Sequence, residues 1–230
     1  MDENEQLELI KIVIVGDSGV GKTNIIYRYT KEIVPSKIEP NSIDEVITKK
    51  LTIKDKQITL HIWDLPGKAG FQSPFLPMLC KSSDGGFIVY DISQRESFEN
   101  VNKWFEALNN SLPKNSTIIL LGNKSDLNSE RKVELNEGQK KAEDLKISFY
   151  ETCASNLKDI NDVFNELLNQ IIEKMDKSEK EEKEEKEKKE ENFEDETKKE
   201  DDWEKIEKNE EKSIKNDIKA QNKKCKCPCF

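Results

Sequence analysis

Residues 16–23 read Gly-Asp-Ser-Gly-Val-Gly-Lys-Thr, and the apolar run Leu9–Val15 (LIKIVIV) stands directly before them. This short, β-branched run is typical of a strand that is buried on both faces. The pattern Gly-x-x-x-x-Gly-Lys-Thr between a strand and a helix is that of a phosphate-binding loop. Its glycines let backbone amides approach phosphate oxygens closely, where side chains would obstruct them. We therefore expect Gly16–Thr23 to bind the phosphates of a nucleotide.

The rest of the first 175 residues alternates between strand-like and helix-like patterns. A predicted turn at residues 54–56 separates two alternating runs that predict an antiparallel hairpin, Val46–Ile53 and Gln57–Trp63. Further strands are predicted at Gly86–Asp91, Thr117–Leu121 and Ser148–Glu151, and helices at residues 23–29, 96–109, 135–145 and 160–175. This alternation indicates an α/β fold with a mostly parallel, six-stranded, doubly wound sheet and helices on both faces. In such a sheet, ligands bind at the carboxyl ends of the strands.

Composition separates a globular part from a charged tail. The 230 residues contain 34 % hydrophobic and 37 % charged side chains and carry a net charge of −9. Glu and Lys dominate residues 176–224, which cannot bury enough apolar surface to offset the entropy of ordering. We expect a globular domain over residues 1–175, a disordered or helical low-complexity tail over 176–224, and a Cys-rich end over 225–230.

Several classes of protein are disfavoured by the same sequence. The first ten residues have no apolar core typical of a secretory signal, and no run approaches the ~20 apolar residues that span a bilayer. We therefore expect a cytoplasmic protein whose five cysteines are reduced thiols. The acidic balance gives no reason to expect nucleic-acid binding.

Two motifs together predict the ligand. Lys22 is expected to reach the β- and γ-phosphates of a nucleotide, and the Thr23 hydroxyl to bind Mg²⁺. Asn123-Lys-Ser-Asp126 directly follows a predicted buried strand and indicates the base. A carboxylate in this loop can accept two N–H bonds from guanine, whereas adenine offers no such pair and would leave it unpaired. The expected ligand is therefore GTP or GDP.

Taken together, these residues resemble the Ras superfamily of small GTPases, and most of all its Rab branch, over residues 8 to 174. The resemblance implies the P-loop NTPase fold of small G proteins. It also implies that Asn123 and Asp126 bind guanine while Lys124 packs along the ring. The stretch GFIVYDISQRESFENVNKWF at residues 86–105 is Rab-like as well.

Two further segments carry the resemblance. Glu151–Ser155 (ETCAS) resembles the family's last nucleotide motif, in which the Ala154 amide would meet the guanine carbonyl. Trp63–Gly67 (WDLPG) resembles the family's WDTAG motif, which implies that Asp64 holds Mg²⁺ through water and that the Gly67 amide touches the γ-phosphate. The motifs and the resemblance together assign the nucleotide to Gly16, Asp17, Ser18, Gly19, Val20, Gly21, Lys22, Thr23, Asn24, Asp64, Gly67, Asn123, Lys124, Asp126, Cys153, Ala154 and Ser155.

The sequence departs from the family at the loops that would sense the γ-phosphate. Counting back from the WDLPG motif, the switch I threonine that binds Mg²⁺ falls on Asn41, whose amide oxygen is a less natural ligand than a hydroxyl. The water-orienting glutamine after Gly67 is replaced by Lys68. An ammonium group donates hydrogen bonds only and cannot accept a proton from water, so we expect slow GTP hydrolysis. Pro66 and the prolines at 74 and 77 favour a stiffer or less helical switch II.

The last residues predict lipidation. Cys227-Pro-Cys-Phe230 reads as a C-a-a-X sequence whose final Phe favours geranylgeranylation. The alternatives are double prenylation of the Cys225-x-Cys227 pair, palmitoylation of Cys225 or Cys229, and a merely cysteine-rich end. Lysines at 215, 219, 223 and 224 would strengthen the attachment of a lipidated chain to a membrane.

We therefore interpret the chain as a Rab-like GTP-binding switch of vesicle trafficking, a monomer held by a C-terminal lipid on the cytosolic face of an endomembrane. Its partners would be effectors, exchange factors and GTPase-activating proteins. The alternative is a nucleotide-dependent scaffold with little or no intrinsic GTPase activity, which Lys68 and the unusual switch I favour. A P-loop kinase or ATPase would leave the NKSD and ETCAS segments unexplained.

Overall fold

The computed structural model describes residues 8–35, 46–65, 67, 70–178 and 180–181. The chain divides into two units, Met1–Met175 and Asp176–Phe230, and the fold below is that of the first unit. Within the described residues, no helix has the length and apolar character that crossing a bilayer requires.

The core of the fold is a six-stranded sheet in the order β2-β3-β1-β4-β5-β6. β2 is antiparallel to β3, and the other neighbouring strands run parallel. The mostly parallel sheet and its one hairpin were both predicted from sequence, and both predictions are confirmed. The strands are β1 (Glu8–Val15), β2 (Val46–Ile53), β3 (Lys56–Asp64), β4 (Gly85–Asp91), β5 (Thr117–Asn123) and β6 (Ser148–Glu151).

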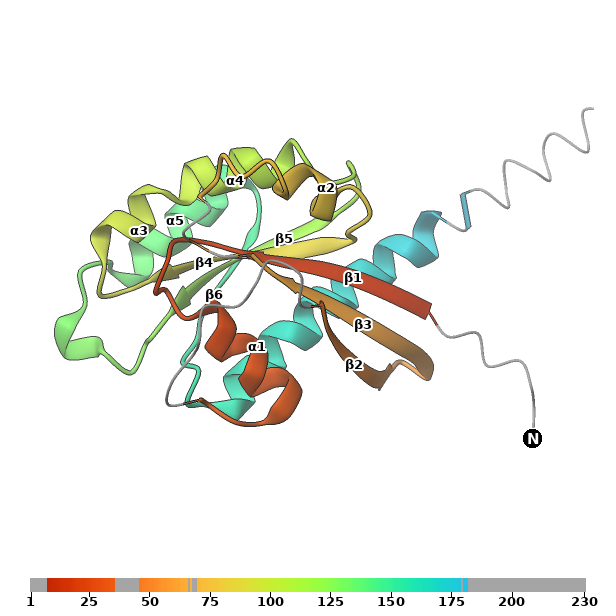
Figure 1. The fold of residues 1–230 in the computed structure, drawn as a ribbon, viewed down its shortest axis with the longest axis horizontal. Coiled ribbons are helices and arrows are strands. Elements are labelled where there is room, and N and C mark those ends of the chain that lie inside the picture. The colour runs from red at the N-terminus through yellow and green to blue at the C-terminus, as the bar shows by residue number, and fades with distance from the viewer. Residues whose placement is uncertain (1–7, 36–45, 66, 68–69, 179, 182–230) are drawn as a thin grey trace, which may run out of the picture. The chain divides into compact units, whose positions relative to one another are not determined.

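Helices cover both faces of the sheet (Figure 1). They are α1 (Lys22–Lys31), α2 (Leu76–Cys80), α3 (Arg95–Glu99), α4 (Val101–Asn109), α5 (Leu135–Leu145), a 3₁₀ turn (Asn128–Glu130) and a last helix over residues 157–178. The helix predicted over residues 96–109 is two helices that meet at Asn100. α2 was not predicted as a helix, and it is only five residues long with a proline in its first turn.

Alternation of side chains along the buried strands builds two cores. Ile10, Ile12 and Ile14 of β1 pack with α1 and the last helix, whereas Val13 and Val15 pack on the other face with α2, α4 and α5. Because both faces are covered, these strands read as continuous apolar runs. The parallel strands also end at one edge of the sheet, so their following loops gather there.

Candidate functional site

The loop after β1 is closely surrounded by neighbouring backbone and side chains. Gly16 has a φ of 143°, and a Cβ there would overlap the Val89 carbonyl oxygen of β4. Gly21 has a φ of 100°, and its Cβ would overlap the Asn123 side-chain amide. Both glycines are therefore required by left-handed backbone and by close approach. Gly21 also caps the N-terminus of α1, whose amides and dipole favour an anion.

Lys22 places a buried amine inside this loop. The side chain is only 6 % exposed, and its Nζ donates to the carbonyl oxygens of Gly16, at 2.7 Å, and Asp17, at 2.8 Å. Burial lowers the pKa of Lys22 to about 8, although Asp64 and Asp17 oppose this shift. A phosphate near the amine would restore the charged form, because opposite charge favours ionisation.

Two hard oxygen groups meet beside the loop. The Thr23 hydroxyl at the start of α1 donates to the Asp64 carboxylate at the end of β3, with 2.6 Å between Oγ1 and Oδ2. Gly67 lies against the loop as well, since a Cβ there would be 2.5 Å from the Asp17 carbonyl carbon and the Ser18 nitrogen. Gly67 therefore packs directly against the backbone of the phosphate loop.

The loop after β5 is tied to the phosphate loop. Asn123 is 1 % exposed, and its Nδ2 donates to the Val20 carbonyl at 2.8 Å. The next residue, Lys124, has a φ of 66°, and its ammonium group lies 2.7 Å from the carboxylate of Asp91. Asp91 is fully buried at the end of β4. This ion pair fixes the left-handed turn that starts the loop.

Asp126 is oriented by the loop after β6. The Cys153 thiol donates to Asp126 Oδ1 at 2.9 Å, and Cys153 Sγ lies 2.6 Å from the Ser155 hydroxyl oxygen. The Ser125 amide donates to the Thr152 carbonyl at 3.1 Å. The NKSD and ETCAS segments thus form one unit. Sequence reasoning placed Cys153 in this motif but did not anticipate its bond to the carboxylate.

Asp17 has partners that the sequence did not reveal. Its carboxylate accepts hydrogen bonds from Asn100 Nδ2, at 2.8 Å, and from Trp104 Nε1, at 2.7 Å. Trp104 is 1 % exposed, and the ring of Phe71 meets it edge-on with centroids 5.8 Å apart. The one signal in the sequence was the position of Asp17 itself. A carboxylate in a loop expected to face phosphates needs hydrogen-bond donors from elsewhere in the chain.

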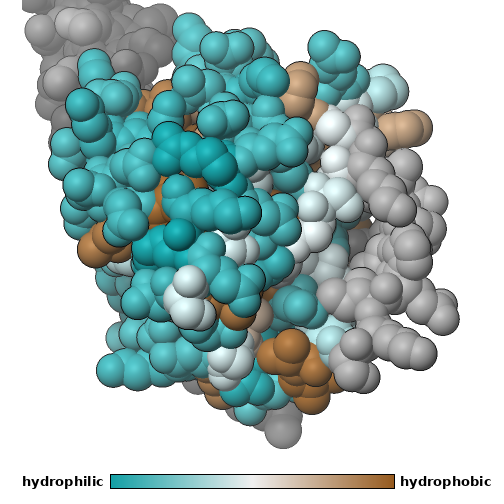
Figure 2. Space-filling view, turned by 90° about the vertical axis from the view of Figure 1, so that its left-hand side faces the viewer, coloured by the Kyte–Doolittle hydropathy of each residue, from teal (hydrophilic) through white to brown (hydrophobic). Residues whose placement is uncertain are grey.

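The structure brings the described residues of four predicted segments, the phosphate loop, WDLPG, NKSD and ETCAS, to one edge of the sheet. Figure 2 views the molecule from the side on which β1 ends, and hydrophilic residues cover most of this face. The positions assigned to Asn41, Lys68 and the three C-terminal cysteines, Cys225, Cys227 and Cys229, lie outside the described residues.

Comparison with known proteins agrees with this geometry. A model of the Ras family matches residues 11–173. The Ras-related protein Rab-11C of Dictyostelium discoideum is 38 % identical over 74 % of this chain and 76 % of the relative. The Ras-related protein RABA1b of Arabidopsis thaliana is 34 % identical, and the GTP-binding protein ypt3 of Schizosaccharomyces pombe is 33 % identical, each over 74 % of this chain and 78 % of the relative.

The six-stranded sheet, the phosphate loop and the paired NKSD and ETCAS segments define a P-loop GTPase. The chain belongs to the Ras family, and it is a Rab-like member of that family. It is accordingly a GTP-binding switch of the kind that acts in vesicle trafficking.

Proposed function

We propose that the loops at this edge of the sheet hold GTP or GDP and that their change between the two states is read by partner proteins. The observation that carries the proposal is the buried Lys22 amine, which donates to the loop carbonyls of Gly16 and Asp17 and is influenced by the charge of Asp64, the partner of Thr23. Competition of GDP, GTP, ADP and ATP against a fluorescent GDP tests it. Binding that is displaced equally by adenine nucleotides would refute the guanine assignment.

Mg²⁺ fits the oxygen groups of the site. The Thr23 hydroxyl and the Asp64 carboxylate are hard ligands, and Mg²⁺ binds through few protein oxygens together with waters and substrate phosphates. Consistent with this mode, the described part of the chain contains no group of three or more His, Cys, Asp or Glu side chains that would form an all-protein metal cage. When bound, the ion would offset phosphate charge. Asn41 remains the proposed third ligand, from switch I.

The residues of this chain have separable tasks in hydrolysis. Lys22 would place a positive charge at the β- and γ-phosphates, and the Gly67 amide would donate to the γ-phosphate; the packing of Gly67 against Asp17 and Ser18 supports this role. The position that orients the attacking water is Lys68, a group that donates but does not accept. The chain therefore hydrolyses GTP slowly and keeps the GTP-bound form for longer.

Single-turnover phosphate release measures this slowness directly. Lys68→Gln is expected to raise the intrinsic rate, because a glutamine can both donate to and accept from the water. Lys140→Gln, on the exposed surface of α5, is the matched control and leaves the rate unchanged. Equal rates for wild type and Lys68→Gln would contradict the role of Lys68.

The same measurement of phosphate release distinguishes a switch from the alternative, a nucleotide-dependent scaffold. A scaffold would release no phosphate even with a cell extract that supplies activating proteins, whereas a switch is accelerated by it. The Rab-named relatives do not favour the scaffold.

Attachment to the cytosolic face of an endomembrane completes the proposal. A prenyl group on Cys227, or on Cys225 and Cys227 together, would anchor the monomeric chain, and Cys229 is a further acceptor. One chain alone binds membranes only marginally, so the nearby lysines or a second lipid are needed. Mass spectrometry of the C-terminus from native cells tests this, and three unmodified thiols would refute it. Exchange factors, activating proteins and effectors would act on the anchored switch.

A further inference from the structure

Asp91, the last residue of β4, is a buried carboxylate that has no task in the proposed function so far. The residue is fully buried, and it pairs with Asn123, the last residue of β5, in the register of the sheet. The Ile92 amide donates to the Asn123 carbonyl at 3.1 Å, which ties the two strand ends together. Asp is almost never fully buried unless it is paired, because burial removes its charge from water. The partners of Asp91 therefore indicate what the carboxylate does.

One oxygen of this carboxylate is held by the turn that follows β4. Oδ1 accepts hydrogen bonds from the Ser93 amide, at 2.9 Å, and from the Ser93 hydroxyl, at 2.7 Å. The backbone of Asp91 is fixed as well, since its amide donates to Ser97 Oγ at 3.0 Å. These local contacts set the rotation of the carboxylate and so the direction of its second oxygen.

The second oxygen of Asp91 is paired with Lys124 of the NKSD segment. Lys124 Nζ lies 2.7 Å from Oδ2, and Oδ2 accepts no other hydrogen bond within the described residues. Lys124 has a φ of 66°, a left-handed conformation that persists in a residue with a Cβ only where surrounding contacts enforce it. The ion pair with Asp91 is such a contact.

The same ion pair restricts the path of the Lys124 side chain. Its ammonium group is held at the end of β4, whereas its backbone directly follows β5, so the methylene stem spans the space between the two strand ends. A Cβ at Gly21 would lie 4.0 Å from Lys124 Cε, so the stem passes beside the start of α1. The Lys124 side chain is 29 % exposed. A lysine stem can cover an apolar surface while its ammonium group is bound elsewhere.

We propose that Asp91 is a positioning residue of the guanine site, which acts by holding the Lys124 ammonium so that the Lys124 stem lies in place against one face of the guanine ring. This inference rests on the proposed binding of guanine nucleotides. It assigns to the end of β4 a part in base recognition alongside the NKSD and ETCAS segments. The ring contact is then prepared before the nucleotide arrives, which lowers the cost of ordering a long side chain on binding.

The test measures release of GDP from the full chain. The protein is loaded with Mg²⁺ and with GDP that carries a fluorophore on the ribose, and excess unlabelled GDP is added. Asp91→Asn keeps the shape of the side chain but weakens its hold on the ammonium group, because a charged pair is stronger than a bond to a neutral amide. Release should quicken about tenfold. Ser93→Ala removes only one donor to Oδ1 and should quicken release about threefold, which keeps the test decisive if Asp91→Asn fails to fold.

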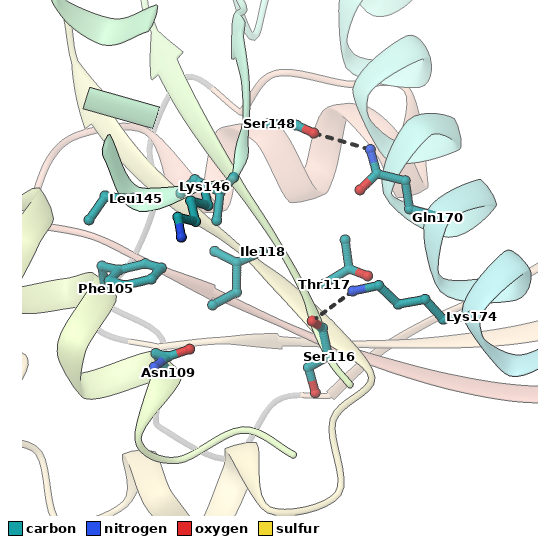
Figure 3. Close-up of a pocket in the computed structure, with 11 residues that line it drawn as sticks. Phe105, Asn109, Ser116, Thr117, Ile118, Leu145, Lys146, Ser148, Gln170 and Lys174 are labelled. Atoms are coloured by element: carbon teal, nitrogen blue, oxygen red, sulfur yellow. Dashed lines mark hydrogen bonds between the residues drawn. The ribbon is translucent and has the colours of Figure 1, made fainter. Parts of the chain in front are cut away.

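Variants of neighbouring residues separate positioning from damage to the fold. In the Lys124→Met background, Asp91→Asn should quicken release no further, because the ammonium group that it positions is gone. Ser97→Ala disturbs the backbone of the same turn, so it should lower the melting temperature and leave GDP release unchanged. Lys146→Gln is the control for loss of a lysine charge, since this side chain lines a cavity beside the first residues of β5 and β6, at the strand ends away from Lys124 (Figure 3).

A second nucleotide distinguishes contact with the ring face from contact with the ring edge. IDP lacks the 2-amino group that Asp126 is expected to bind, so wild type should release IDP faster than GDP. The ring face is common to both bases. Asp91→Asn should therefore quicken release of GDP and of IDP by the same factor, whereas a general distortion of the NKSD loop would reduce the preference for GDP.

The outcomes separate this inference from the proposed function on which it rests. Displacement of GDP from wild type equally by ATP would exclude the guanine site itself. A guanine-specific wild type whose release rate is unchanged in Asp91→Asn and in Ser93→Ala would exclude only the role of Asp91. That role is also overturned by equal acceleration with and without Lys124, by equal acceleration in Ser97→Ala, or by an effect on GDP that exceeds the effect on IDP.

Discussion

Lys22→Met measures how strongly the fold disfavours the ammonium group in its phosphate loop. Burial lowers the pKa of Lys22 from 10.5 to about 8 in the folded protein, and each pKa unit corresponds to about 1.4 kcal/mol. The buried charge therefore destabilises the nucleotide-free fold by about 3 kcal/mol at neutral pH. Because the folded pKa is the lower one, the unfolded state binds more protons between pH 8 and 10.5. Stability must rise with pH across this window, and the full penalty is present below it.

Urea unfolding of the nucleotide-free wild type and the Lys22→Met variant, from neutral pH up to 10.5, isolates the contribution of the Lys22 charge to the free energy of unfolding. Other titrating groups are common to both proteins and cancel in the difference between their free energies of unfolding. The bonds to Gly16 and Asp17 cancel nearly as well, since a neutral amine also donates. We expect this difference to move in favour of the wild type by about 3 kcal/mol over the window. A difference that stays constant with pH would refute the assignment of a depressed pKa to Lys22.

Three further substitutions address the contacts around the loop. Trp104→Phe keeps an aromatic ring but removes the donor to Asp17, so GDP dissociation, followed by chase of a fluorescent analogue, should quicken about tenfold; an unchanged rate would contradict the contact's role. Cys153→Ala removes the thiol donor to Asp126 and should lower the affinity for GDP, measured by calorimetry, several-fold. Cys153→Ser keeps a donor at this position, so its affinity should be close to that of wild type. Gly16→Ala forces a Cβ onto the Val89 carbonyl, so thermal unfolding should show a large loss of stability; a melting temperature equal to that of wild type would exclude the overlap.

The elements that sequence predicted well are those specified by local patterns. β1 reads as a strand because its run of Ile and Val is buried on both faces, and α1 starts where the glycines end. The hairpin of β2 and β3 follows from alternation around a tight turn with two residues at positive φ, Lys54 and Asp55. The order of the strands in the sheet has no comparable local signal, and it was not predicted from the sequence.

The contacts that sequence missed join residues far apart along the chain. Asp17 and Trp104 are 87 positions apart, and Cys153 and Asp126 are 27 apart. In each case the residue types allow a hydrogen bond, but many other pairs of donors and acceptors in the chain would allow one equally well. Only the arrangement of the strands and helices selects the partner. Asn100, where the predicted helix is divided into α3 and α4, also donates its side-chain amide to Asp17, and this contact had no local signal either.

Asp17 connects three parts of the site. Its carbonyl oxygen accepts from Lys22, its carboxylate accepts from Asn100 and Trp104, and its backbone lies directly against Gly67. Phe71, in the segment after Gly67, packs edge-on against the Trp104 ring. A displacement of Gly67 would therefore change contacts of the Asp17 backbone, and a displacement of Phe71 would change the packing of Trp104, one of the side-chain partners of Asp17. Gly67 thus contacts the phosphate loop directly, and Phe71 is linked to it through Trp104 of α4.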